Sequence, residues 1–396
     1  MNGASRYRPY PRYRDSGVEW LGEVPEGWEV QRLKYIATCQ FSNVDKKSHE
    51  DEKTVCLCNY VDVYYNDIIL PGMNFMQATA SKEEIARFSI LQGDVIITKD
   101  SESWDDIAIP AYVEGEFDYV LCGYHLAQIR ADHSVIEPKY LFWCFKSTSI
   151  NSQFQVASTG VTRFGLGKHG LTSALFLTPS IPEQTAIAAF LDRETARIEA
   201  LIGKKRRLIA LLQEKRAALI SHAVTKGLDP DAPMKDSGVE WLGEVPAHWE
   251  VKRLRFVVNK IEQGWSPQCH SHKAENGEWG VLKVGCVNWL RFNPDENKAL
   301  PEELEPKIEY LIEQNDILMS RANTKELLGS AALVSENPQG KLILCDKLYR
   351  IRTIEWLEPA FLVYILSTPQ TRFHFEREAT GASGSMQNIG QDTVKN

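Results

Sequence analysis

The chain has 396 residues, of which 43% are apolar and 25% charged, a composition typical of globular proteins and a length with room for two or three domains. No apolar run approaches the roughly 20 residues that a membrane-crossing helix needs, and residues 1–14 lack the apolar segment of a signal peptide. We therefore expect a cytoplasmic protein with no membrane partner. The net charge of −8 argues only weakly against nucleic acid, because binding depends on where the charge lies.

The eight cysteines form no C-x-x-C pair, and a disulfide framework is not expected in a chain of this length. The densest group of metal-binding side chains is Cys269-His270-Ser271-His272. Zinc sites usually take four ligands from two separated pairs, and the sequence has no second pair. We therefore expect no metal site.

A signature of sixteen residues occurs twice, at 15–30 and at 236–251. Fourteen of the sixteen positions are identical, with the pattern D-S-G-V-E-W-L-G-E-V-P-x-x-W-E-V and an offset of 221 residues. Repeats of about 20–50 residues build solenoids, whereas this offset is long enough for a whole domain. The sequence therefore predicts two domains of one kind.

Short strands are predicted after the first signature, because the segments concerned alternate or are rich in Val, Ile, Cys and Tyr. A strand entry is expected over 28–35, a strand over 95–98 after the Gly93-Asp94 turn, and Glu137-Pro138 predicts the start of a helix. Two further strands are expected over 54–63 and 119–130. Short strands with a few helices predict an α+β fold for each copy.

The second copy keeps the same positions in register. Asp94 corresponds to Asp316 and Arg130 to Arg352, both at an offset of 222, while the residues between these positions differ almost completely. A duplicated scaffold with unlike loops is what we expect of two binding sites for two different targets.

A long helix is predicted between the copies, over residues 182–226. Pro182 and Glu183 suit a first turn, and Gly227 suits the end. At about 1.5 Å per residue this helix spans roughly 65 Å, more than globular packing requires. The excess of Lys and Arg over 203–226 predicts a solvated face, or contact with phosphates or an acidic partner. The apolar heptad positions, which we call the seam, predict pairing with another helix; they are Ile187, Leu191, Ile198, Leu201, Leu208, Leu212 and Leu219.

Catalytic motifs are not found. The run from Gly165 to Gly170 matches G-x-G-x-x-G, but a dinucleotide site needs a strand before it and a helix after it, and Pro179 and Pro182 follow closely. We expect this run to be a loop that closes the first domain. Without a P-loop, a nucleophile elbow or an Asn-Pro-Pro motif, the sequence does not resemble an enzyme, and no cofactor is expected on this chain.

Two polar segments are candidates for ligand contact, residues 99–104 and 320–325, because they follow equivalent strands in the two copies. Arg, Lys, Asn, Ser and Thr are the side chains that contact base edges and phosphates. The alternative interpretation is a solvated surface loop. The candidate DNA-binding residues are Lys99, Ser101, Arg163, Lys168, Arg321, Asn323, Thr324 and Lys325.

Together, the duplicated signature, the Gly93-Asp94-Val95 turn with Lys99-Asp100, and Ile181-Pro182-Glu183-Gln184 at the start of the helix resemble the specificity (S) subunit of type I restriction-modification systems. The resemblance covers nearly the whole chain. It implies two similar α+β target recognition domains, separated by a long coiled-coil helix, each reading one half of a split site in double-stranded DNA. It also implies that helical regions dock methyltransferase (M) subunits, which carry S-adenosylmethionine and methylate adenine N6. Restriction (R) subunits would add ATP-driven and Mg-dependent translocation and cleavage.

The expected domains are a first recognition domain at 1–178, the spacer helix at 179–228, and a second recognition domain at 229–396. Family members end with a second helix that pairs with the first. Here the chain stops at Asn396, so the second domain is expected to lack that helix. Two other functions stay open at this point: a self-contained DNA modification enzyme with an unrecognised active site, and a truncated donor cassette that does not assemble.

Overall fold

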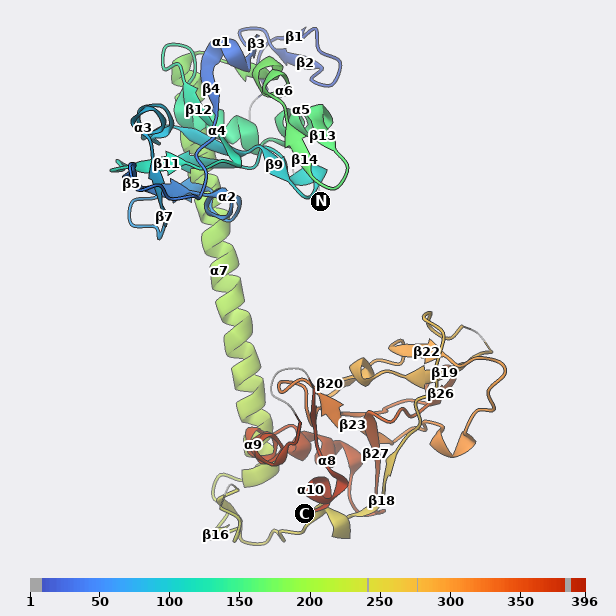
Figure 1. Cartoon of the computed structure of the whole chain (residues 1–396). Coiled ribbons are helices and arrows are strands. Elements are labelled where there is room, and N and C mark those ends of the chain that lie inside the picture. The colour runs from blue at the N-terminus through green and yellow to red at the C-terminus, as the bar shows by residue number, and fades with distance from the viewer. Residues whose placement is uncertain (1–8, 241, 276, 382–385) are drawn as a thin grey trace. The chain divides into compact units, whose positions relative to one another are not determined.

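The computed structural model describes residues 9–240, 242–275, 277–381 and 386–396 (Figure 1). The chain divides into two packed units, Met1–Gly203 and Lys204–Asn396, which we call unit 1 and unit 2. The division falls within one long helix, α7 (Ile181–Lys226), which lies between two sheet-rich parts of the chain. The predicted α+β class with a long central helix is confirmed.

Unit 1 is built on a five-stranded sheet whose middle strands are buried on both faces. Along β8, Val95 and Ile97 belong to one apolar cluster and Ile96 to the cluster on the other face, the period of two that a strand requires. Helices α4 (Pro138–Lys146) and α5 (Thr148–Ala157) contribute to the first of these clusters. The strand order is β4 (Ala37–Phe41), β12 (Leu126–Ala131), β8 (Val95–Thr98), β10 (Pro110–Val113) and β6 (Ile68–Ile69).

A second sheet of unit 1 corrects two of the predicted strands. The segment 54–63 is strand only as far as Cys58, because Asn59 and Asp62 form a capping box that starts a helix. The segment 119–130 is two strands and not one. It breaks at Gly123, whose N–H donates to the Cys58 carbonyl and where a Cβ would lie 2.8 Å from that oxygen. The elements are β11 (Val120–Cys122), β5 (Lys53–Cys58), β7 (Met76–Ala80), α2 (Tyr60–Tyr64) and α3 (Lys82–Phe88).

Unit 2 repeats the sheet order of unit 1. Its main sheet runs β18, β27, β23, β25, which matches β4, β12, β8, β10, and its second sheet again pairs two strands in parallel. The duplication therefore extends from the sequence to the topology. The strands are β18 (Val258–Gln263), β27 (Leu348–Thr353), β23 (Ile317–Ser320), β25 (Ala331–Leu333), and, in the second sheet, β22 (Asn297–Ala299), β19 (Trp279–Leu282) and β26 (Lys341–Ile343).

The signature folds into a hairpin in both units. Strand β1 (Tyr13–Asp15) pairs with β2 (Glu23–Pro25), and β16 (Met234–Asp236) pairs with β17 (Glu244–Pro246) in the identical register. In unit 1 the signature continues into β3 (Glu29–Arg32), which pairs with β15 (Leu175–Thr178).

Helix α7 begins at Ile181, one residue before the predicted start, and ends at Lys226. Gly227 follows it with a φ of 79°, as the sequence predicts for a left-handed residue after a helix. The predicted domain boundaries 1–178, 179–228 and 229–396 stay a proposal. The boundary between the two packed units lies inside α7, so each unit includes one end of this helix and the helix is not separated as a domain of its own.

The other helices are α1 (Leu33–Ile36), α6 (Lys168–Ser173), α8 (Pro359–Leu366), α9 (Pro369–Glu378) and α10 (Gln391–Lys395), with single 3-10 turns at Trp104–Asp106, Leu254–Phe256, Val284–Cys286 and Ile308–Tyr310. The other strands are β9 (Asp100–Ser101), β13 (Ser158–Gly160), β14 (Phe164–Leu166), β20 (Val287–Asn288), β21 (Arg291–Phe292), β24 (Ala322–Asn323) and β28 (Gln387–Asn388).

Candidate nucleic-acid interface

A three-stranded sheet brings the predicted contact segment 99–104 of unit 1 close to the candidate residues Arg163 and Lys168, about 60 residues later in the sequence. Strand β9 follows β8 after one residue and pairs with β14, whose label lies next to that of β9 in Figure 1. In this pairing Ser101 lies opposite Phe164. The Leu166 N–H donates to the carbonyl of Lys99 at 2.8 Å. Residues 99–101 and 163–168 therefore form one edge of unit 1.

Unit 2 builds the same arrangement from its own residues. Strand β24 follows β23 and pairs with β28, and the N–H of Ile389 donates to the Arg321 carbonyl at 2.9 Å. The predicted contact segments thus lie at matched edges of the two units. They also contain short strands, which the interpretation as plain loops did not anticipate.

In unit 1 the two residues nearest β8 are engaged within the protein. The Lys99 ammonium donates to the Ser42 carbonyl at 3.2 Å and lies 4.6 Å from the centre of the Tyr124 ring. Ser101 is 6% exposed, and its hydroxyl lies 3.4 Å from the Tyr60 hydroxyl. Both side chains therefore have contacts within the protein, and their part in DNA contact stays a prediction.

The exposed cations of this edge are Arg163 and Lys168. A guanidinium nitrogen of Arg163 lies 3.2 Å from Nδ1 of His125, which itself lies 3.1 Å from a carboxylate oxygen of Asp100. Lys168 is the first residue of α6 and is exposed. Arg163 is therefore exposed but in contact with His125, and Lys168 is exposed at the start of α6.

In unit 2 two of the four predicted residues are buried or partly buried, and the other two are exposed. Arg321 is partly buried and donates to the Asp346 carbonyl at 3.2 Å. Asn323 is 9% exposed, with its amide nitrogen 3.5 Å from the Ser320 hydroxyl. Thr324 and Lys325 are exposed, and the Lys325 ammonium lies 3.9 Å from a carboxylate oxygen of Glu376.

Aromatic side chains beside both edges were missed by the sequence interpretation. In unit 2 the Arg372 guanidinium lies 4.0 Å from the centre of a Trp289 ring and also donates to the carbonyl of Glu326. In unit 1 the rings of Tyr60 and Tyr64 stack at 5.4 Å beside Ser101. Their spacing of four residues was the available signal, because on a helix it places both rings on one face. Rings of this kind stack on bases.

Positions 94 and 316, which keep register between the copies, carry a structural aspartate. Asp94 accepts hydrogen bonds from the Leu91 N–H, Gln128 and Arg130, and Asp316 accepts from the Glu313 N–H and Arg352. Both aspartates are 1% exposed. They fix the turn that enters β8 or β23, and so fix where each contact segment begins.

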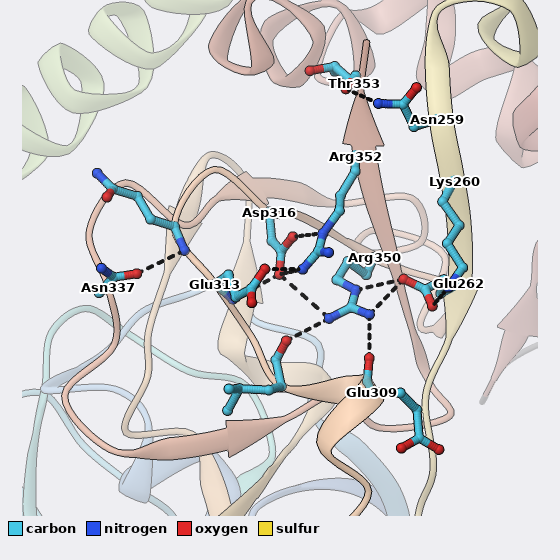
Figure 2. Close-up of polar contacts among 12 residues, drawn as sticks. Asn259, Lys260, Glu262, Glu309, Glu313, Asp316, Asn337, Arg350, Arg352 and Thr353 are labelled. Carbon is cyan, nitrogen blue, oxygen red and sulfur yellow. Dashed lines mark hydrogen bonds and ion pairs between the residues drawn. The ribbon is translucent and has the colours of Figure 1, made fainter. Parts of the chain in front are cut away.

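Beside this aspartate the two units carry different cross-strand pairs, and Figure 2 shows the pair of unit 2. In unit 2, Glu262 lies opposite Arg350 across the strands, and the guanidinium donates to the carboxylate at 2.6 Å. In unit 1 the equivalent cross-strand pair is Gln40 and Gln128. Burial alone would raise the pKa of Glu262, but hydrogen bonds from Lys260 and Arg350 outweigh burial and lower it. One scaffold therefore carries a neutral pair in one unit and an ion pair in the other.

The seam of α7 is mostly exposed. Ile187 packs against the core of unit 1 and Leu191 is partly buried. The other five seam side chains are between 47% and 66% exposed, namely Ile198, Leu201, Leu208, Leu212 and Leu219.

No group of three or more His, Cys, Asp or Glu side chains in the described part of the chain could hold a metal ion. Burial raises the pKa of the Cys269 thiol, which disfavours the thiolate that binds metal. The run from Gly165 to Gly170 is not the predicted loop, since it enters β14 and α6. It belongs to an antiparallel sheet, unlike the parallel unit of a dinucleotide site. A search of the described helices finds none long and apolar enough to cross a membrane.

Comparisons with known proteins give one consistent result. The chain is 29% identical over 190 residues to the type I restriction enzyme EcoEI specificity subunit of Escherichia coli, covering 48% of this chain and 32% of that protein. It is 26% identical over 302 residues to the putative type I restriction enzyme MjaX specificity subunit of Methanocaldococcus jannaschii, covering 76% of this chain and 68% of that one. No family model matches.

Solved structures share the fold. One, from a study of complex assembly and conformational transition of the type I restriction-modification system, aligns with 94% of this chain and 85% of its own at a TM-score of 0.62 and 19% identity. The HsdS subunit from Thermoanaerobacter tengcongensis aligns with 94% of this chain and 84% of its own, at 0.52 and 20% identity. In sequence and in fold, the chain is a relative of the specificity subunits of type I restriction-modification systems.

Proposed function

We propose that this chain recognises DNA in sequence-specific fashion, with each unit reading one half of a bipartite target. The observation that supports this most directly is that two units of equal sheet order carry unlike side chains at matched edges. An identical scaffold fixes the geometry of contact, and different side chains then select different bases.

In this proposal the exposed side chains at the edges meet the DNA and the buried ones support them. Arg163, Lys168 and Lys325 contact phosphates, and the rings of Tyr64 and Trp289 are close enough to the edges to stack on or wedge against bases. Ser101 and Asn323 are positioning residues, because both are almost completely buried.

The chain is not itself catalytic in this proposal. Methyltransferase subunits dock on the exposed seam of α7 and supply S-adenosylmethionine, and restriction subunits bring ATP and Mg. An overall charge of −8 suits a subunit that shares its phosphate contacts with such partners. Because its target is DNA, we expect it to act in the cytoplasm.

The decisive test is an exchange of one module. Residues 16–160 are replaced by the corresponding module of another specificity subunit, the protein is expressed with its M subunits, and methylated adenines are mapped across the genome. We expect one half of the methylated motif to change and the other half to persist. A change in both halves would contradict independent reading.

A second measurement separates recognition from catalysis. The purified chain is incubated with DNA and labelled S-adenosylmethionine, first alone and then with M subunits. Label transferred to DNA by the chain alone would show an enzyme in its own right, and failure to co-purify with M subunits would show a chain that does not assemble.

A further inference from the structure

The two units place different elements at one position of their common scaffold. In unit 1, β5 leads into helix α2, which packs against β8 and β10. In unit 2, β19 leads through a 3-10 turn into the hairpin of β20 and β21, which packs against β23 and β25. Because β23 and β25 match β8 and β10 in the sheet order, the hairpin and α2 cover equivalent strands.

The hairpin of unit 2 has one apolar and one polar face. Val287 pairs with Phe292, and Asn288 pairs with Arg291. Val287 is 1% exposed, and Phe292 packs against the same apolar cluster. Alternation along the strands puts Asn288 and Arg291 together on the opposite face, and both are exposed. One face therefore anchors the hairpin, and the other presents an amide and a guanidinium to solvent.

The side chains of this polar face have no partner within the described part of the chain. Neither Asn288 nor Arg291 makes a hydrogen bond or an ion pair with any described residue. By contrast, the guanidinium groups of Arg350, Arg352 and Arg372 donate to carboxylates or carbonyls of unit 2. The donors of Asn288 and Arg291 are therefore available to a ligand.

The turn of the hairpin is strained and is held by hydrogen bonds. Trp289 and Leu290 join the two strands with φ values of 29° and 66°. Tight hairpin turns with positive φ usually contain Asn-Gly, because bulky side chains are unfavourable in that conformation. The Trp289 N–H donates to the Ser330 hydroxyl at 2.7 Å, and the Leu290 N–H donates to the Ala331 carbonyl at 2.9 Å. Strained conformations persist where their surroundings fix them, and they cluster at functional sites.

Helix α9 connects the hairpin to the contact edge of unit 2. The Arg372 guanidinium lies 4.0 Å from the centre of a Trp289 ring and donates to the Glu326 carbonyl at 2.9 Å. One turn later on α9, a carboxylate oxygen of Glu376 lies 3.9 Å from the Lys325 ammonium. The hairpin and the contact segment are thus held by one helix and belong to one edge.

An exposed Asn beside an exposed Arg on a hairpin matches the chemistry of base edges. Arg donates to guanine O6 and N7, and Asn pairs with adenine N6 and N7. The major groove of DNA admits a two-stranded β-ribbon. Directly opposed residues of a hairpin have Cβ atoms about 4.5–5.5 Å apart, and successive bases of one strand are separated by about 3.4 Å. The two side chains are therefore spaced to reach neighbouring base pairs.

We propose that the hairpin of β20 and β21 is the element of unit 2 that selects bases, with Arg291 on a guanine and Asn288 on an adenine of a neighbouring base pair. The inference rests on the proposed function, because it assumes that unit 2 binds one half-site, and it adds which residues select bases and which bases they select. In unit 1 the equivalent element presents Tyr64 and the 77% exposed Tyr65 instead, so we expect its half-site to differ.

The first test changes Arg291 to Ala, expresses the chain with its M subunits and maps methylated adenines across the genome. We expect one G·C position to lose its preference, in the half of the motif that persists when residues 16–160 are exchanged. Asn288→Ala should relax a neighbouring A·T position of the same half. Relaxation in the other half, or at a position that is not G·C for Arg291→Ala, would overturn the inference. If the module exchange changes one half and Arg291→Ala leaves the motif unchanged, the proposed function stands and this inference fails.

The second test measures binding of the assembled complex to four duplexes, which carry the mapped motif or one of the three other base pairs at the relaxed position. The unmodified complex should prefer G·C at least about tenfold, and Arg291→Ala should bind all four duplexes alike. Weaker binding by Arg291→Ala with the preference for G·C intact would show a phosphate contact and would overturn base reading. The matched control is Arg255→Ala, which removes an exposed arginine from the 3-10 turn Leu254–Phe256 and should keep the preference.

Discussion

At the scale of single residues, the cross-strand pair Glu262–Arg350 offers a test of how the two units differ. The Arg350 side chain is 3% exposed and also donates to the carbonyls of Leu311 and Glu309. Removing one partner of a buried ion pair costs about 3–5 kcal/mol, because the other charge stays buried. We therefore expect Arg350→Gln to lower the free energy of unfolding of unit 2 by about 3 kcal/mol, measured by urea denaturation.

The matched control is the double variant Glu262→Gln with Arg350→Gln, which reproduces the Gln40–Gln128 pair of unit 1. We expect it to be more stable than Arg350→Gln alone. A lowered pKa means that Glu262 stabilises the folded state above its unfolded pKa, and that this contribution is lost as the pH falls through the folded pKa. The free energy of unfolding of the double variant should therefore lack the contribution of Glu262 that is lost as the pH falls. A double variant less stable than the single one would show that the charges are not coupled.

Lys325 is the residue of the unit 2 edge whose role as a phosphate contact is simplest to measure. It is exposed, and its ion pair with Glu376 is long, at 3.9 Å. We expect Lys325→Ala to weaken binding to all DNA sequences alike and to flatten the salt dependence by about one unit of slope, since one phosphate contact is lost. Binding by the assembled complex is measured from low to high salt.

Lys235→Ala serves as the control, because Lys235 is an exposed lysine of the β16–β17 hairpin and lies outside the proposed edge. It should leave affinity and salt slope unchanged. If Lys325→Ala behaves like Lys235→Ala, this edge does not touch the phosphate backbone.

At the scale of elements, the seam of α7 predicts association. Burying each apolar side chain is worth about 1.5–3 kcal/mol, so the five exposed seam residues represent on the order of 10 kcal/mol before the entropic cost of pairing. We expect the purified chain to self-associate at micromolar concentration in light scattering, and expect M subunits to suppress this. Changing Leu201, Leu208 and Leu212 to Glu should give a monomer. A monodisperse monomer of the unmodified chain would show that the seam requires no partner.

At the scale of the whole molecule, duplication explains both the similarity and the difference of the two units. Each unit has its own sheets and its own apolar clusters, so each scaffold stabilises itself. The side chains at the two contact edges can therefore change independently, because a substitution at Arg163 lies outside the apolar clusters of unit 2 and one at Lys325 lies outside those of unit 1. This separation is the physical basis for expecting that an exchanged module changes one half of the target.

The sequence by itself determined the features that depend on local signals or on the comparison of one copy of the repeat with the other. The repeat at 15–30 and 236–251, the α+β class and the bounds of α7 are of this kind, because Pro182, Glu183 and Gly227 act within one helical turn. It also predicted that 99–104 and 320–325 occupy matched places, because both follow equivalent strands, and the structure shows that Asp94 and Asp316 hold equivalent turns before those strands.

Only the tertiary structure decided the features that depend on partners distant in sequence. The pairing of β9 with β14, the burial of Ser101 and Asn323, and the break at Gly123 each result from a segment between 20 and 70 residues away. Whether the sequence W-E-V-x-R-L, at residues 28–33 and 249–254, becomes a strand is the plainest case. In unit 1 this stretch pairs with β15, whereas residues 250–253 lie outside every strand of the described part of unit 2, because a strand needs a neighbour and the local sequence does not contain one.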